Sequence, residues 1–387
     1  MVAGAVDSVG LAFGWTVFNL VAVLRHGLAA TAVLNAAMFC GIALSAPAAA
    51  RLTRRLNGRQ VLQATAGVEA LLRVWSLALL YWGAPLPVLV VMVLAMNVVG
   101  WIGFAGMRVE IAAADPDAAG MTRYLAVTVA LEAAGASLAA LLPISGHGGI
   151  SATWVAVALV AYGLSLLPTT VVANASTVAV SAVRTVTTGV DAVHRRLLAA
   201  GAVLMIVGSG PTLLFVGLAT KLHGHSAVAG AAVAFAIGSL LSPAASRLLF
   251  RHGTSVLGTW PFWCAGMALG WAAAPWSMVG LLVAQLLSGL CLTGFQGAMD
   301  HALAGDADDG HATTSLAQGS AARAVGSAAA VRLVPLFSAP VPLAAFAGVT
   351  ALLGLVGGAV LARVVDPAAD GDAEPRAIAS PVTAPVA

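Results

Sequence analysis

The chain contains very little charge. Only 9% of its 387 residues are Asp, Glu, Lys or Arg, a single lysine occurs at Lys221, and 60% of the residues are hydrophobic. A soluble protein of this length needs many more charged side chains to cover its surface, so the composition excludes an ordinary soluble fold. The mean hydropathy of +0.97 indicates a membrane protein.

Other scarcities exclude classes of chemistry. The three cysteines, Cys40, Cys264 and Cys291, fall within apolar segments and lack the spacing of a metal site, so we interpret them as buried thiols. No phosphate-binding loop of the type Gly-x-x-x-x-Gly-Lys occurs, which excludes ATP as an energy source within this chain. The sequence also lacks the clustered His, Asp and Glu residues of an intramembrane enzyme. We therefore expect no enzymatic activity, no metal and no cofactor.

Long apolar runs dominate the chain. Each extends over about 20 residues, enough to cross a hydrocarbon core of about 30 Å as an α-helix. We place twelve such spans at 5–24, 30–50, 61–82, 86–106, 122–142, 152–171, 197–219, 226–246, 256–274, 277–298, 316–337 and 342–363. The sequence therefore predicts an all-α membrane protein with twelve transmembrane helices.

Short sequence features occur twice, about 191 to 196 residues apart. Gly-Phe-Ala-Gly at 103–106 has its counterpart in Gly-Phe-Gln-Gly at 294–297, and both are followed by a pair of aspartates. Leu-Ser-Ala-Pro at 44–47 has its counterpart in Leu-Ser-Pro at 241–243, and an Arg-Leu pair follows each. The shared offset indicates one duplication and two pseudo-symmetric six-helix halves.

The duplication divides the chain into four parts. We predict an N-terminal six-helix bundle at 1–171, a cytoplasmic linker at 172–196 and a C-terminal bundle at 197–364. The tail at 365–387 contains acidic residues and prolines, a composition typical of disorder.

The arginines predict the orientation. They lie mainly in the loops after spans 2 and 8, around loop 4–5 at Arg108 and Arg123, and between the halves. These loops share one side if the spans alternate. The positive-inside rule places that side and both termini in the cytoplasm. We expect the chain to reside in the plasma or inner membrane of the cell. The formal charge of +3 then follows from topology and indicates no nucleic-acid partner. Four tryptophans near predicted helix ends fit an interfacial belt: Trp82, Trp154, Trp260 and Trp276.

The loop between spans 2 and 3 resembles a signature of the major facilitator superfamily. That signature has a Gly, a Leu two residues on, an Asp two further, and then Arg-x-Gly-Arg. Here the segment at 50–59 keeps the Leu, both Arg and the second Gly of the signature but has one extra residue, with Ala50 in place of the first Gly and Arg54 in place of the Asp. In the second copy, Phe250 replaces the Asp. A basic loop beside a membrane is also expected from topology alone. The resemblance implies a gating loop formed by Arg51, Arg55, Gly58, Arg59, Arg247, Arg251 and Gly253.

The resemblance also implies two bundles that enclose a substrate site near the midplane. Charged residues inside the spans are informative because an ionised group at bilayer depth costs about 3 kcal/mol or more unless a partner or water faces it. Glu132 lies near the middle of span 5 and is our first candidate for proton coupling; the alternative is a protonated carboxyl bonded to a neighbouring helix. Glu69 and Arg73 share a helix face and can pair with each other, whereas Asp7 lies near the start of span 1, where it can sit at the interface. Glu69 and Asp7 are further coupling candidates.

Polar residues on the helices that the resemblance assigns to the cavity are substrate-binding candidates. Each is equally suited to bind a neighbouring helix. They are Asn19, Asn97, Trp101, Gln285, Gln296 and Arg332.

These observations predict a secondary transporter for a small molecule. We expect proton-coupled efflux of a small amphipathic compound such as a drug or secondary metabolite, by a monomer working through alternating access. The alternatives are an uptake permease for a small organic solute and a membrane protein that does not transport.

Overall fold

The computed structural model describes residues 2–115, 118–140, 142, 144–145, 149–176, 192–213, 219, 222–223, 227–250, 255–305, 312–333 and 340–365. These residues are almost entirely helical. The helices of the first half are α1 (Val2–Leu52), α2 (Gly58–Tyr81), α3 (Leu86–Ala114), α4 (Ala118–Ala140), α5 (Ala152–Leu164) and α6 (Leu167–Ala175). Those of the second half are α7 (Ala192–Leu213), α9 (Ala227–Phe250), α10 (Val256–Ala273), α11 (Met278–Gly305), α12 (Ala312–Leu333) and α13 (Pro340–Val365). Two short strands, β1 (Ile144–Ser145) and β2 (Gly149–Ile150), pair antiparallel.

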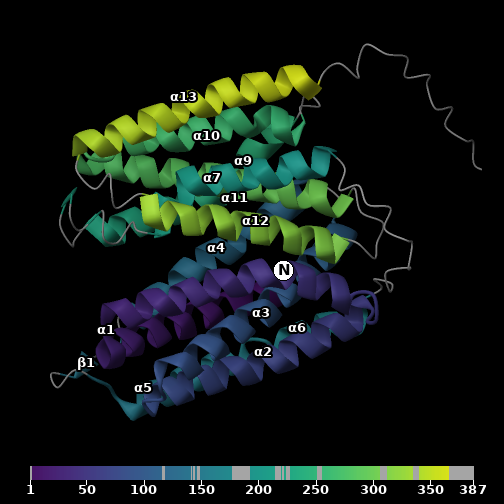
Figure 1. Ribbon diagram of the computed structural model, residues 1–387, viewed down its shortest axis with the longest axis vertical. Coiled ribbons are helices and arrows are strands. Elements are labelled where there is room, and N and C mark those ends of the chain that lie inside the picture. The colour runs from purple at the N-terminus through teal and green to yellow at the C-terminus, as the bar shows by residue number, and fades with distance from the viewer. Residues whose placement is uncertain are drawn as a thin grey trace, which may run out of the picture.

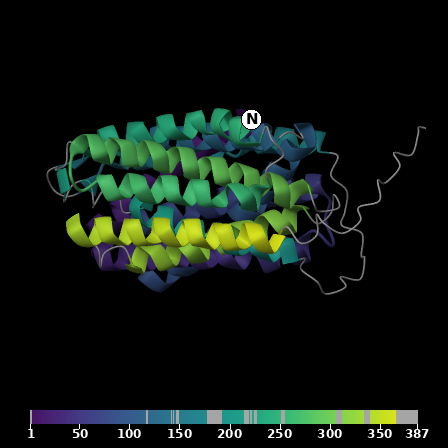
Figure 2. The same cartoon turned by 90° about the horizontal axis from the view of Figure 1, so that it is seen from above.

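The two halves lie side by side, with their helices running in roughly the same direction (Figure 1). The view from above shows the same alignment of helix axes (Figure 2). Helices α1 to α6 form one group and α7 to α13 the other, and α1, α3 and α4 contact α9, α11 and α12 across the boundary.

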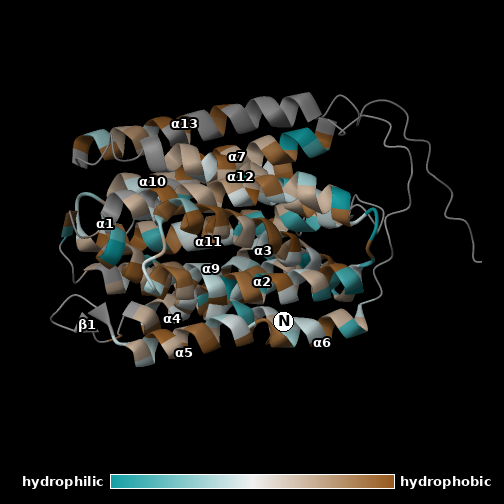
Figure 3. Ribbon diagram, turned by 60° about the horizontal axis from the view of Figure 1, so that its bottom comes forward, coloured by the Kyte–Doolittle hydropathy of each residue, from teal (hydrophilic) through white to brown (hydrophobic). Residues whose placement is uncertain are grey.

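Seven helical segments in the described residues are long and apolar enough to cross a membrane. They are Val2–Ala22, Val33–Leu52, Gly58–Tyr81, Leu86–Ala114, Ala152–Ala175, Ala229–Phe250 and Met278–Ala304. Hydrophobic residues extend along the helices, and hydrophilic residues gather mainly near the helix ends (Figure 3). The prediction of an all-α membrane fold is confirmed.

Three predicted spans differ from the structure in where the helices join or break. Spans 1 and 2 join in α1 through a kink at Gly27, whose φ of 80° lies in the left-handed region that glycine adopts without strain. Span 6 is broken into α5 and α6 around Ser165, and Pro168 lies in the first turn of α6. Because proline has no backbone N–H to continue the helical ladder, the break falls just before it.

The duplication is visible in how the helices pack. Gly135 of α4 lies against the backbone of Val9 in α1, and Gly326 of α12 lies against the backbone of Ala202 in α7. A β-carbon at either glycine would collide with the carbonyl oxygen of its partner. Small residues thus allow the same close helix approach at corresponding places in both halves.

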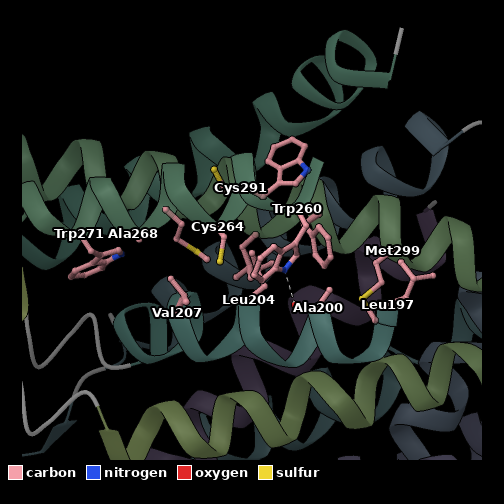
Figure 4. Packing of buried hydrophobic residues seen from close by; sticks show 14 of the residues in the cluster. Leu197, Ala200, Leu204, Val207, Trp260, Cys264, Ala268, Trp271, Cys291 and Met299 are labelled. Atoms are coloured by element: carbon pink, nitrogen blue, oxygen red, sulfur yellow. Dashed lines mark hydrogen bonds between the residues drawn. The ribbon is translucent and has the colours of Figure 1, made fainter. Parts of the chain in front are cut away.

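The interior of the second half is rich in tryptophan. Trp260 is only 4% exposed and donates its Nε1–H to the Ala200 carbonyl oxygen at 2.9 Å (Figure 4). The prediction of an interfacial Trp260 is therefore wrong, because a backbone acceptor inside the bundle satisfies its indole. Trp82 and Trp276 are exposed near helix ends, as predicted.

The three cysteines do not share one environment. Cys264 and Cys291 are buried in this same core, as predicted (Figure 4). Cys40 is exposed, so its interpretation as a buried thiol is wrong.

Candidate functional site

A buried ion network joins the two halves. Arg108 of α3 donates from Nη1 to Asp300 Oδ2 of α11 at 2.5 Å, and Arg323 of α12 donates from Nη1 to Asp300 Oδ1 at 2.7 Å. The Nη2 of Arg108 also donates to Ser320 Oγ at 2.7 Å. The side chains of Arg108 and Asp300 are both 0% exposed. Two guanidinium groups thus share one carboxylate in a site closed to solvent.

Arg108 is not the loop arginine that the sequence predicts. Helix α3 continues to Ala114, beyond the predicted span end at 106, so Arg108 lies inside the helix. Burial of a guanidinium at this position is tolerable because Asp300 supplies the opposite charge. The orientation must therefore rest on the other arginines.

Further contacts between the halves lie near the same end of the molecule. We call it the linker end: the end at which α1 finishes at Leu52, α6 finishes at Ala175 and α7 begins at Ala192. Here the hydroxyls of Thr53 and Thr314 lie 3.4 Å apart.

The backbones also come close towards this end. Gly297 of α11 packs against Thr122 of α4 so tightly that a β-carbon at Gly297 would collide with the threonine. Together with the ion network and the two threonines, this contact closes the two halves against each other at the linker end.

A second buried ion network lies within the first half. Arg73 of α2 donates from Nη1 to Asp7 Oδ1 of α1 at 2.6 Å and from Nη2 to Glu69 Oε1 at 2.5 Å. Its guanidinium also lies 5.2 Å from the centre of the Tyr162 ring and donates to Ser165 Oγ at 3.1 Å. The expected pairing of Glu69 with Arg73 is present. Asp7 does not lie at an interface but joins this network, because Arg73 reaches it from α2.

A small pocket adjoins this second network. It is lined by residues of α1, α2, α3, α4 and α6 and has room for about one water molecule. Asp7, Glu69 and Tyr124 are among its lining residues.

Glu132, the first coupling candidate, lies half-buried on α4. Its carboxyl lies near the Ser8 side chain of α1 and within electrostatic reach of Asp7. Within the described residues, no arginine or lysine forms an ion pair with it. Glu132 is thus near the Asp7 network but outside its charge pairing.

The substrate-cavity candidates of the first half make contacts within that half. Asn35 donates to Asn19 Oδ1 at 3.2 Å, and Asn19 itself donates to the Trp15 carbonyl. Asn97 donates to the Val93 carbonyl of its own helix. The Trp101 ring packs edge-on against Phe104.

The candidates of the second half differ in burial. Gln285 is 1% exposed, and its Nε2 has no hydrogen-bond partner among the described residues. Gln296 is half-buried, and its Nε2 lies 3.6 Å from the Met205 sulfur. Arg332 belongs to α12, but its side chain lies outside the described part of the structure.

The predicted gating loop is exposed. Arg51, Arg55 and Arg59 have exposed side chains, and in the part of the chain that the structure describes none of them pairs with a carboxylate. Gly58 begins α2, where Asn57 and Gln60 form a capping box. Arg247 is exposed in the last turn of α9, and the predicted residues Arg251 and Gly253 lie outside the described residues.

The residues that join the halves were not among the candidates predicted from the sequence. Asp300 falls two residues beyond the predicted span 277–298 and reads as a loop residue. Arg323 falls inside the predicted span 316–337. A charged residue within a membrane span is costly, so its position could have indicated a functional role.

Known structures share this arrangement over nearly the whole chain. No protein-family model matches the sequence, and no curated protein matches it. A bacterial homologue of the iron transporter ferroportin, solved in an outward-facing state, is 16% identical with a TM-score of 0.67, over 94% of this chain and 98% of that one. The major facilitator superfamily transporter FucP, in the outward conformation, is 13% identical with a TM-score of 0.59, over 92% and 98%. The human organic anion transporter MFSD10 is 14% identical with a TM-score of 0.67, also over 92% and 98%. The resemblance expected from the sequence is confirmed in the architecture: the chain has the fold of the major facilitator superfamily.

Proposed function

We propose that the chain is a secondary transporter that exports a small amphipathic compound in exchange for protons, by alternating access. The proteins that share its fold are described as transporters, among them a fucose:proton symporter and an organic anion transporter. The observation that supports the proposal most strongly is the buried network of Arg108, Asp300 and Arg323, which spans both halves at one end.

This network suits a joint that opens and closes. A buried ion pair adds little stability over well-packed apolar side chains, because removing the charges from water offsets most of their attraction. When the halves separate, water can solvate the same charged groups. The free-energy difference between the closed and open states is therefore smaller than it would be if apolar side chains formed this contact. Rocking of the halves about a central site then exposes that site to one side at a time.

Proton coupling is assigned to the carboxyls of the first half. Asp7 and Glu69 are held by Arg73, whereas Glu132 lies near the Ser8 side chain and forms no ion pair with an arginine or lysine of the described residues. An unpaired carboxylate is costly at bilayer depth, so Glu132 should be protonated when dry and release its proton when wetted. Glu132 is therefore the proposed carrier, and Asp7 and Glu69 are secondary candidates.

The substrate is proposed to bind between the halves, among the polar residues predicted from the sequence. Trp101 and Gln296 are half-buried and offer an aromatic face and an amide. We place the linker end and both termini in the cytoplasm, in the plasma or inner membrane. A single chain contains both halves, so the proposed working unit is a monomer. With this orientation, the described conformation is closed towards the cytoplasm.

Transport by purified protein in lipid vesicles tests the proposal. A pH difference is imposed across the vesicle membrane, and a panel of amphipathic drugs, sugars and organic anions is followed. Movement of a compound opposite to the proton flow supports the proposal. Movement of the compound with the protons would instead support an uptake permease. A pH gradient that moves no compound, with protein of verified fold, would contradict proton coupling.

A further inference from the structure

Residues with oxygen-bearing side chains line the pocket of the first half from four helices. Asp7 comes from α1, Thr65 and Glu69 from α2, Tyr124 from α4 and Thr169 from α6. The space holds about one water-sized particle. Oxygen-bearing residues far apart in the sequence thus line one small cavity.

The pairing with Arg73 leaves half of each carboxylate available. Arg73 bonds to Oδ1 of Asp7 and to Oε1 of Glu69, so within the described residues the second oxygen of each has no hydrogen-bond partner. Thr65 donates its hydroxyl proton to the Val61 carbonyl at 2.8 Å, which leaves its oxygen lone pairs unused. Three oxygens can therefore accept a positive ligand.

Two buried residues that line the pocket carry hydroxyls without a hydrogen-bond partner among the described residues. Tyr124 is 2% exposed and Thr169 is 6% exposed, and among the described residues neither hydroxyl makes a hydrogen bond. Gly4 also lines the pocket, and a β-carbon built on Gly4 would lie 2.6 Å from the Tyr124 hydroxyl oxygen. The Tyr124 hydroxyl therefore lies next to Gly4. A hydroxyl without a protein partner can offer its oxygen to a ligand in the pocket.

Glycines keep the space in front of the carboxylate open. A β-carbon at Gly100 would lie 2.6 Å from Glu69 Oε1, and one at Gly103 would lie 3.0 Å from Thr65 Oγ1. Both glycines line the pocket. A side chain at either position would therefore crowd the cavity.

Charge and ligand type identify what fits. Ionised Asp7 and Glu69 beside Arg73 leave one net negative charge, which a monovalent cation balances and a divalent cation exceeds. Hard cations prefer carboxylate and hydroxyl oxygens. A proton needs only one oxygen and no cavity, so the convergence of five oxygen-bearing side chains favours a metal ion.

We propose that this pocket binds a sodium ion. The site lies within one half and goes beyond the proposed exchange of substrate and protons. Because its ligands come from α1, α2, α4 and α6, sodium binding would tie these helices together. Sodium should therefore stabilise the folded protein whether or not transport occurs.

Thermal unfolding of the purified full-length protein tests the site. Melting is compared in sodium chloride, potassium chloride and choline chloride of equal ionic strength at mildly alkaline pH. We expect a saturable rise in the melting temperature with sodium and a smaller one with potassium, because the larger ion with the same charge attracts carboxylate and hydroxyl oxygens more weakly. Absence of a sodium-dependent rise in the wild type would overturn the proposal.

A matched pair of tyrosine variants locates the effect. Tyr124→Phe removes one oxygen from the pocket and leaves the Arg73 pairs intact, so it should weaken the apparent sodium affinity about tenfold or more. Tyr162→Phe removes a hydroxyl that contacts the Met96 sulfur, outside the pocket lining, and should keep the wild-type affinity. Equal sodium affinity in both variants would overturn the assignment to this pocket.

Direct binding of radioactive sodium to the same samples gives a second measurement that requires no transport. Gly100→Ala should lose sodium binding, whereas Gly67→Ala, where a β-carbon would meet nothing within 4 Å, should retain it. Retained binding in Gly100→Ala would overturn the proposal. Failure of the proton-exchange proposal would show in the vesicle assay and leave this result unchanged.

Discussion

Arg108 and Asp300 pair across the two halves, and each follows a copy of the same repeated sequence. Arg108 comes two residues after Gly-Phe-Ala-Gly at 103–106, and Asp300 comes three residues after Gly-Phe-Gln-Gly at 294–297. Their Nη1 and Oδ2 atoms lie 2.5 Å apart. The repeat therefore brings corresponding helix segments to the boundary from both sides. Opposite charges at this point make the contact attractive, whereas like charges would repel.

Removal of the shared carboxylate should destabilise the closed protein. Asp300→Asn leaves Arg108 and Arg323 buried without a counter-charge, and we expect a loss of about 3 kcal/mol or more. Thermal unfolding in detergent measures the loss. The control is Asp115→Asn, whose carboxylate lies 3.8 Å from the exposed Arg123 and should change stability by about 1 kcal/mol or less. Similar shifts for both variants would contradict the importance of the buried network.

A disulfide at the linker end should trap the described conformation. Thr53 and Thr314 hydroxyls lie 3.4 Å apart, so cysteines at both positions should form an intramolecular disulfide on oxidation. The background replaces Cys40, Cys264 and Cys291. We expect oxidation to stop transport and reduction to restore it, while each single cysteine variant is unaffected. Full transport by the oxidised double variant would show that this end need not open.

The same cysteine pair reports on the ion network. If Arg108, Asp300 and Arg323 hold the linker end closed, adding Asp300→Asn should lower the yield of the Thr53–Thr314 disulfide. The yield is measured by gel mobility after brief oxidation. An unchanged yield would mean that other contacts keep this end closed.

Glu132→Gln should uncouple transport from protons. Glutamine keeps the size and much of the hydrogen bonding of the neutral carboxyl but cannot titrate. The variant should bind an uncharged substrate yet fail to concentrate it under a pH difference in vesicles. The control is Glu110→Gln, since Glu110 is bonded to Ser176 near the linker end, away from the Asp7 network. Wild-type accumulation with Glu132→Gln would move the proposed carrier to Glu69 or Asp7.

Cysteine labelling should settle the orientation. Arg59 and Trp82 lie at opposite ends of the first half, and both side chains are exposed. In the cysteine-free background, Trp82→Cys should react with a membrane-impermeant reagent on intact cells. Arg59→Cys should react only after the cells are opened. The reverse pattern would invert the proposed topology.

The sequence by itself determined that this is a helical membrane protein built from two related halves. The low charge and the apolar runs of about 20 residues predict transmembrane helices. In a bilayer every backbone N–H and C=O must be hydrogen-bonded within the protein, and a helix does this within its own segment. The pairing of Glu69 with Arg73 was also predictable, since four residues bring side chains to one helix face. These properties depend only on composition and local spacing.

Only the tertiary structure decided which distant charges meet. The contact of Arg108 with Asp300 joins residues 192 positions apart, and that of Asp7 with Arg73 joins residues 66 apart. Neither follows from the period of a helix. Each contact forms because a buried guanidinium needs an opposite charge on a helix that packs against it. Which helix packs there depends on the fold of the whole chain.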